Sequence, residues 1–125
     1  MDTGKQYITL CQKAKEIQES WQPREGDFIA GTYCGVMVYT ISSVYRDPVI
    51  WLPRQDQLQE IVGVSHVHPP FLDLQRWHDW AIIKVNADYW DKFASMEQLW
   101  FAFIMKQRYN KVWSIEKDEW VKLSV

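Results

Sequence analysis

The sequence predicts an α+β fold: an antiparallel sheet of three to five strands packed against two longer helices and one or two short ones. Three observations lead to this prediction. The length of 125 residues fits a single domain, residues 1–125. Hydrophobic residues make up 47% and charged residues 24%, which is the composition of a globular protein with its own core. Segments with helical and with strand patterning do not alternate in the regular way that a parallel sheet requires.

The first predicted helix covers residues 7–21. Its apolar residues recur at intervals of three and four, a spacing that only a helix gathers onto one face. Thr3 and Gln6 have the spacing of a capping box ahead of it, and Pro23 and Gly26 follow as stop signals. We therefore expect one continuous helix in this segment.

Three strands are expected next. The segment Asp27–Tyr45 is rich in Val, Ile, Thr and Tyr, and Cys34-Gly35 in its middle predicts a turn between two antiparallel strands. A turn at Arg46–Pro48 then leads into a short third strand, Val49–Leu52.

A short helix is predicted from Arg54 to Val62. Pro53 precedes it, and proline suits a first helical turn because its φ is fixed and its missing N–H is not needed there. Beyond it, Phe71–His78 is expected to form one or two helical turns, and Trp80–Val85 a fourth strand.

The longest predicted helix runs from Met96 to about Tyr109. Ser95 and Gln98 have capping-box spacing at its start. Its centre, Leu99–Met105, is apolar on all sides, which predicts a helix covered from more than one direction and therefore the spine of the core. After it, Lys111–Ile115 is expected to be a short strand or a turn.

Charge and cysteine content argue against several functions. Fourteen basic and sixteen acidic residues give a net charge of −2, so no basic field favours duplex DNA binding. Cys11 and Cys34 lie in apolar segments without zinc-ligand spacing, which favours buried free thiols in a reducing compartment. No secretory signal is evident, and Leu99–Met105 is too short to cross a membrane. We expect a cytoplasmic protein without a membrane partner or a cofactor.

Three histidines carry the strongest hint of a metal site. In an extended segment His66 and His68 point to the same side, and His78 or Asp79 can supply a third ligand. The favoured alternative is that they are polar residues of a proline-rich loop. His78 and Asp79 also form an acid–base pair in sequence, but adjacent side chains usually diverge. A metal-dependent enzyme that uses His66, His68 and His78 is thus an alternative function.

A junction between strand and helix combines residues that suit binding. Trp51 and Arg54, with Pro53, Gln55 and Gln57, offer a flat aromatic ring together with guanidinium and amide groups. Such a set can grip a peptide or an unstacked base. The favoured alternative is that Trp51 is a core residue and the glutamines lie on an exposed helix face.

The number of aromatic residues is unusual. Eight Trp are more than a domain of this size is expected to bury completely, and exposed aromatics cluster at interfaces. We expect Trp77, Trp80, Tyr89 and Trp90 to be partly exposed, and we predict that a patch of Trp77, Trp80 and Trp90 is covered by a protein partner or by a second copy in a homodimer. A platform that stacks a carbohydrate or a nucleotide needs the same residue types. A further alternative is binding of single-stranded nucleic acid by aromatic stacking, with basic residues between Lys106 and Lys122.

Several segments resemble a known group of proteins. Trp51–Leu58, Ser95–Trp100 and Tyr109–Trp113 resemble small uncharacterised proteins of bacterial phages and prophages, and Glu16–Trp21 and Glu25–Asp27 are similar too. The resemblance implies a mobile-element setting inside a bacterial cell, and it carries no activity with it. We therefore expect a non-enzymatic, prophage-type accessory or protein-interaction protein.

Overall fold

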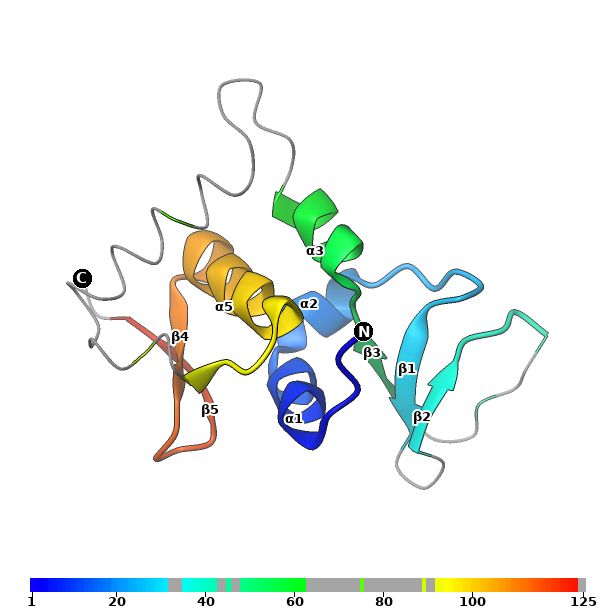
Figure 1. Cartoon of the computed structure of the whole chain (residues 1–125), viewed down its shortest axis with the longest axis horizontal. Helices are drawn as coiled ribbons and strands as arrows, with labels where there is room; N and C mark the ends of the chain where they lie inside the picture. Colours follow the sequence, from blue (N-terminus) through cyan, green and yellow to red (C-terminus); the bar gives the residue numbers. More distant parts are fainter. Residues whose placement is uncertain are drawn as a thin grey trace.

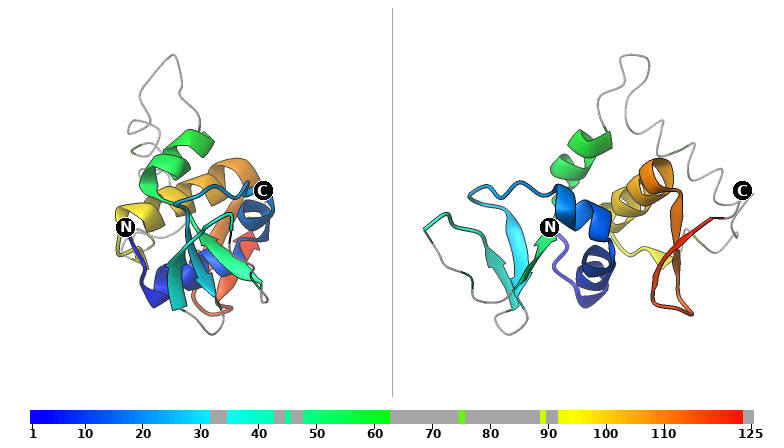
Figure 2. Two further views of the ribbon diagram at one scale, coloured as in Figure 1. Left: turned by 90° about the vertical axis from the view of Figure 1, so that its right-hand side faces the viewer. Right: turned by 180° about the vertical axis from the view of Figure 1, so that it is seen from behind.

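Helices separate two small antiparallel sheets that lie at opposite ends of the structure (Figure 1). Figure 2 shows the same arrangement from behind. The computed structural model describes residues 1–31, 35–42, 45, 48–62, 75, 89 and 92–123. Its elements are α1 (Lys5–Lys13), α2 (Lys15–Ser20), β1 (Phe28–Gly31), β2 (Gly35–Val38), β3 (Val49–Leu52), α3 (Gln55–Val62), α5 (Met96–Tyr109), β4 (Lys111–Ser114) and β5 (Glu119–Lys122). The predicted α+β class is confirmed, with the described strands divided between two sheets.

The three-stranded sheet has the strand order β2-β1-β3, and both pairings are antiparallel. Ile29 in the central strand lies opposite Met37 on one side and Trp51 on the other. The three strands predicted between residues 27 and 52 are therefore confirmed. Gly35 takes a φ of 67°, a left-handed conformation that glycine adopts without strain as β2 begins.

The predicted single N-terminal helix is wrong, because the chain breaks between α1 and α2. Ala14 leaves the helical region at φ −94° and ψ 77°, and its N–H bonds to the carbonyl of Cys11. The break gives α2 a direction of its own, and Gln18 bonds to the backbone of Trp51 in β3. Apolar periodicity does not reveal the break, since Cys11 before it, Ile17 after it and Ala14 itself are all buried.

The capping box predicted at Thr3 and Gln6 is also absent. Gly4 occupies the N-cap position of α1 without a side-chain cap, and the amide of Gln6 donates instead to the carbonyl of Lys92. Asp2 replaces the box, because its carboxylate accepts the N–H of Gly4 and hydrogen bonds from Ser95 and Gln98. The N-terminal segment is thereby tied to the start of α5.

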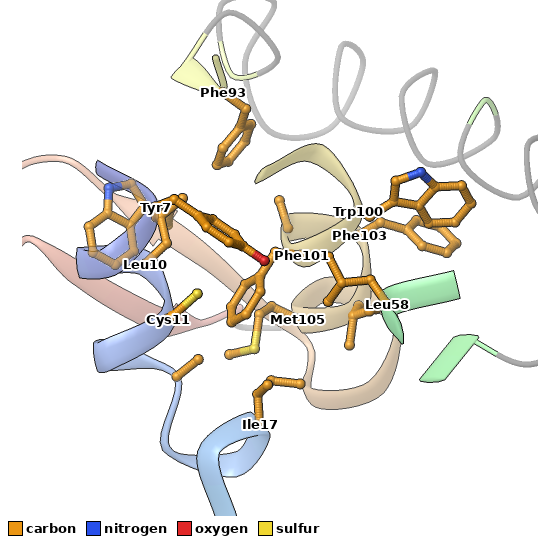
Figure 3. Close-up of a cluster of buried hydrophobic side chains, with 14 of the residues drawn as sticks. Tyr7, Leu10, Cys11, Ile17, Leu58, Phe93, Trp100, Phe101, Phe103 and Met105 are labelled. Carbon is orange, nitrogen blue, oxygen red and sulfur yellow. The ribbon is translucent and has the colours of Figure 1, made fainter. Parts of the chain in front are cut away.

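Helix α5 is the spine of the core, as its apolar centre predicts. Its residues 98–105 are all buried, and Figure 3 shows Phe101 and Met105 facing α1 while Phe103 lies near Leu58 of α3. Tyr7 of α1 packs edge-on against Phe101 with ring centroids 5.9 Å apart. The core cluster takes side chains from every described strand except β2.

The boundaries of α5 match the prediction. The Ser95 hydroxyl accepts the N–H of Gln98 at 3.2 Å, and the Gln98 side chain in turn accepts the N–H of Ala94 at 3.0 Å. At the other end Asn110 adopts a left-handed conformation with φ 55°, which asparagine tolerates better than most residues. Side chains at both ends therefore fix the length of the helix.

The hairpin sheet consists of β4 and β5, and it packs against α5 and α1. Val112 pairs with Val121, and Trp113 with Trp120. The indole Nε1 of Trp120 donates to the carbonyl of Leu10 at 3.0 Å, which ties the hairpin to α1. Of the two possibilities expected after α5, a short strand or a turn, the structure has the strand, and the last apolar segment pairs with it.

Two predicted elements cannot be compared with the structure. The helical turns at Phe71–His78 and the strand at Trp80–Val85 lie outside the described residues, apart from Gln75. Within the described part of the chain, no helix combines the length and the apolar character needed to cross a membrane.

Candidate binding pocket

A pocket of about 210 Å³ opens beside two stacked tryptophans. The C-terminal end of α2, the connection to β1, strand β3 and helix α3 together form its walls. Its apolar lining comes from Trp21, Trp51 and Ile61, and its polar lining includes Arg24, Gln57 and Glu60.

The two indoles hold each other nearly parallel. The Trp21 and Trp51 rings lie 6.1 Å apart between centroids and are inclined by 12°. Trp21 also meets the ring of Tyr39 edge-on at 5.6 Å. Gln18 fixes the backbone of Trp51, because its amide accepts the N–H at 2.8 Å and donates to the carbonyl at 2.9 Å. These contacts give the pocket a wall that is already ordered before a ligand binds.

A buried carboxylate accepts hydrogen bonds from three residues that line the pocket. Asp27 is only 2% exposed and accepts three hydrogen bonds: from Trp21 Nε1 at 2.9 Å, from the Arg24 N–H at 3.0 Å and from Gln57 Nε2 at 2.8 Å. The guanidinium of Arg54 lies 3.7 Å from the same carboxylate. A buried charge is tolerated when it is paired and hydrogen-bonded in this way. One side chain thus joins the α2–β1 connection to α3.

Gly26 gives Asp27 its position. Gly26 has a φ of 90°, a backbone conformation that residues other than glycine rarely adopt. Its N–H bonds to the carbonyl of Tyr39, while the Asp27 carbonyl accepts the N–H of Tyr39 at 2.7 Å. The chain therefore turns sharply just before β1 and directs the carboxylate inward.

The chemistry of the pocket is an apolar floor with a charged rim. Arg24 and Glu60 are exposed, with opposite charges. Trp51 is 6% exposed, and its Nε1 has no hydrogen-bond partner among the described residues. A volume of about 210 Å³ is below the roughly 300 to 1,000 Å³ of sites for drug-sized ligands. The pocket accommodates a single side chain better than a nucleotide or a cofactor.

Two of the predicted binding residues meet at this pocket. Trp51 lines it and is also a buried core residue, as the favoured alternative expects, while its role in binding stays a prediction. Arg54 supports it from outside, donating to Asp56 and to the carbonyl of Gly26. The hydrogen bond from Arg54 lowers the pKa of the Asp56 carboxyl. Gln57 does not lie on an exposed helix face, since it is partly buried and its side-chain amide donates a hydrogen bond to the Asp27 carboxylate.

The other predicted site residues lie outside the described part of the chain. They are Trp77, Trp80 and Trp90 of the aromatic patch and His66, His68 and His78 of the metal alternative. The prediction that Tyr89 is exposed with these tryptophans is wrong, because Tyr89 is fully buried and its hydroxyl accepts the N–H of Trp113. Among the described residues, no group of three or more His, Cys, Asp or Glu is arranged to hold a metal ion. Cys11 is a buried free thiol, as predicted, and burial raises its pKa well above the usual value. Cys34 is not among the described residues.

The aromatic residues between Lys106 and Lys122 do not form an exposed stacking surface. Trp113 and Trp120 are both buried and contact each other at 5.2 Å between ring centroids. Lys111 is paired with Glu16, and Lys106 donates to the side chain of Asn110. The two tryptophans of this segment thus belong to the core, while Lys117 and Lys122 are exposed.

Sequence reasoning missed Trp21, Arg24, Asp27, Glu60 and Ile61 as members of one site. Trp21 was expected to complete the apolar face of the first helix, whereas it begins the connection to β1. The available signal was an acidic residue directly before an apolar strand and six positions after a Trp. No protein-family model matches the chain, and no match was found among the curated proteins or the solved structures.

Proposed function

We propose that the chain is a non-enzymatic protein-interaction protein of the phage accessory type, and that the pocket at Trp21 and Trp51 receives one side chain of a partner protein. The observation that carries the proposal is an indole-walled pocket fixed by a buried carboxylate. Tryptophan and arginine are enriched among residues that dominate binding energy at protein interfaces, and both occur here.

An aromatic side chain suits this pocket best. Indole rings bind other rings in offset or edge-on arrangements, which add about 0.5 to 1.5 kcal/mol beyond the area buried. Arg24 and Glu60 at the rim then contact the polar groups of the partner's backbone or neighbouring residues. Because the wall is held by Asp27 and Gln18, little conformational entropy is lost when the ligand enters.

The segments that resemble phage proteins also supply the residues of this pocket. Glu16–Trp21, Glu25–Asp27 and Trp51–Leu58 are distant in sequence, yet they supply the stacked indoles, the buried carboxylate and its Gln57 donor. We include a cytoplasmic location in the proposal, since the thiol of Cys11 is free and a reducing compartment maintains that state.

Nuclear magnetic resonance with small probes tests the pocket directly. N-acetyl-phenylalanine methylamide is titrated into the ¹⁵N-labelled chain, with N-acetyl-glycine methylamide as the matched probe without a ring. We expect the indole N–H signals of Trp21 and Trp51 to shift with the first probe and to stay in place with the second. Shifts that spread over the whole surface, or none at the highest soluble concentration, would contradict the proposal.

Charge reversal at the rim tests binding of a whole partner. Peptides selected from a random displayed library are expected to bind at least about tenfold more weakly to Glu60→Lys, a loss of about 1.4 kcal/mol. The matched control is Glu19→Lys, which is also exposed and lies on α2 without lining the pocket. Equal binding to both variants would place the interaction elsewhere.

The phage setting is tested separately. We expect the gene to lie among phage genes in the chromosome that carries it. A position within an operon of ordinary bacterial metabolism would contradict the setting and leave the pocket hypothesis to the two binding experiments.

A further inference from the structure

We infer that the β2 edge of the three-stranded sheet binds a second copy of the chain, with strand β2 pairing antiparallel to the β2 of its partner around a two-fold axis at Met37. The inference depends on β2 alone and is independent of the pocket.

The two edges of this sheet differ. At the β3 edge, the Gln18 side chain accepts the N–H of Trp51 and donates to its carbonyl, so it occupies the place of a further strand. At the other edge, β2 pairs with β1 alone among the described strands. Natural proteins usually protect such an edge with charges, proline or a covering segment, because an open edge recruits other strands.

The side chains of β2 are unusually exposed for their type. Val36 is 37% exposed and Val38 49%, and Ile41 just beyond the strand is 71% exposed. No β2 side chain belongs to the core cluster or packs against it. Figure 1 shows why, since β1 and β2 lie at the end of the molecule away from α5. The strand therefore contributes little to the stability of one copy.

The hydrogen-bonding register determines which groups of β2 face outward. Tyr39 exchanges its backbone bonds with the β1 side, through the carbonyl of Asp27 and the N–H of Gly26. Because these bonds alternate along an antiparallel strand, Met37 also faces β1, while the N–H and C=O of Val36 and Val38 point away from it. Four backbone groups in a row thus face away from β1 and have no hydrogen-bond partner among the described residues.

This pattern is complementary to itself. A two-fold axis at Met37 places Val36 of one copy opposite Val38 of the other, and each such pair exchanges two N–H···O=C bonds. Both valines lie on the same face of the sheet, in register with Phe28 and Ala30, so their side chains also meet across the axis.

Charge permits the same arrangement. The sequence has no charged residue from Phe28 to Tyr45, although 24% of the whole chain is charged. Two identical copies therefore meet at β2 without the like-charge repulsion that opposes most homotypic contacts of an acidic protein. A neutral, apolar and self-complementary edge identifies a second copy as its occupant.

The dimer is expected to be weak. Stable interfaces bury about 1,200 to 2,000 Å² in total, and a four-residue strand with two exposed valines supplies only part of that area. We therefore expect association that rises across the micromolar range and reverses on dilution.

Sedimentation of the whole chain over a wide concentration range tests the inference. The test variant is Val38→Lys, which puts a charge on the edge. The control is Ile115→Lys, the same change at a residue that is 62% exposed in the turn of the hairpin sheet. We expect the wild type and the control to dimerise and Val38→Lys to remain monomeric. A wild type that stays monomeric at millimolar concentration overturns the inference.

Amide exchange of the wild-type chain provides a measurement that needs no variant. We expect the N–H groups of Val36 and Val38 to gain protection as the concentration rises, while exposed amides of the hairpin turn do not. A dimer that forms without this protection, or that is lost in Trp77→Ser and kept in Val38→Lys, overturns the inference and assigns the dimer to another surface.

Discussion

Two pairs of tryptophans occupy contrasting places in the molecule. Trp113 and Trp120 face each other across the hairpin sheet, both buried, and the ring of Trp120 also stacks on Phe101. Trp21 and Trp51 stack at the three-stranded sheet, where Trp21 keeps part of its surface exposed and a pocket opens beside them. The first pair packs the core, and the second forms a wall.

The difference shows that the number of tryptophans is a poor guide to exposed surface. Four of the five Trp that the structure describes are buried, and Trp21 alone of these is partly exposed. Packing around α5 takes up large rings because the helix is apolar on all sides and is covered by α1, α3 and the hairpin sheet. The indole that keeps exposed surface is Trp21, which is fixed by a hydrogen bond to Asp27 as well as by packing.

The largest expected effect is a difference in stability loss between the buried pair, Trp113 and Trp120, and the pocket pair, Trp21 and Trp51. Trp120→Ala removes a buried indole and its hydrogen bond to Leu10, so we expect the free energy of unfolding to fall by about 3 to 5 kcal/mol. Trp21→Ala removes a partly exposed ring and one of three donors to Asp27, with an expected loss of about 1 to 3 kcal/mol. Urea unfolding measures both losses. Equal losses would break the contrast, and Ile115→Ala in the hairpin turn is the control, with an expected change within about 0.5 kcal/mol.

The second prediction tests whether a polar network holds the pocket. In Asp27→Asn an NH₂ group replaces one carboxylate oxygen and meets donors instead of accepting from them. We expect a loss of about 1.5 to 3 kcal/mol in urea unfolding, because hydrogen bonds to a buried charged group are lost. The control is Asp56→Asn, an exposed carboxylate that pairs with Arg54, expected to change stability by less than about 1 kcal/mol. If both variants lose the same amount, the buried carboxylate does not organise the pocket.

The same contrast explains what the sequence could reveal. The limits of α5 follow from local signals, a serine cap and an all-apolar centre, and the structure has the helix at Met96–Tyr109 as predicted. The strands of the three-stranded sheet follow from β-branched residues and a glycine turn. The break at Ala14 does not, because apolar periodicity continues through it and the tertiary contact of Gln18 with Trp51 is what accompanies it.

The pocket could be predicted only in part. Trp51 and Arg54 were recognised because an aromatic and a cation are close together in sequence. Asp27 and Gln57 were not linked to each other, since their hydrogen bond joins positions thirty residues apart and no local pattern records it. Trp21 was misassigned for a related reason: it continues the apolar period of a helix that ends one residue earlier.

A smaller loss of stability is expected at the helix caps, where Ser95 of α5 can be compared with Thr3 before α1. Ser95→Ala removes the hydroxyl that accepts the Gln98 N–H, so we expect a loss of about 1 kcal/mol. Thr3→Ala alters the residue that the sequence suggested as a cap, but Gly4 is the N-cap of α1, and we expect a change below about 0.5 kcal/mol. Thermal melting of the two variants measures the difference. A larger loss from Thr3→Ala would contradict the cap at Gly4.

The last prediction concerns Asp2, which accepts three hydrogen bonds as Asp27 does but is only partly buried. Burial acts to raise the pKa of Asp2, and the hydrogen bonds from Ser95, Gly4 and Gln98 outweigh it, so the pKa falls below the usual 3.8. A carboxyl whose pKa is lower in the folded chain stabilises the fold at pH values above its unfolded pKa, and this contribution disappears as the pH falls through the folded pKa.

Asp2→Asn is therefore expected to be less stable than the wild type by about 1 kcal/mol at neutral pH. The gap should close as the pH drops below 3.8. Urea unfolding at a series of pH values measures the gap between the two chains directly, so that all other titrating groups cancel. A gap that stays constant down to strongly acidic pH would mean that the Asp2 charge does not hold the N-terminal segment on α5. Asp2 would then stabilise the fold through contacts that do not depend on its charge.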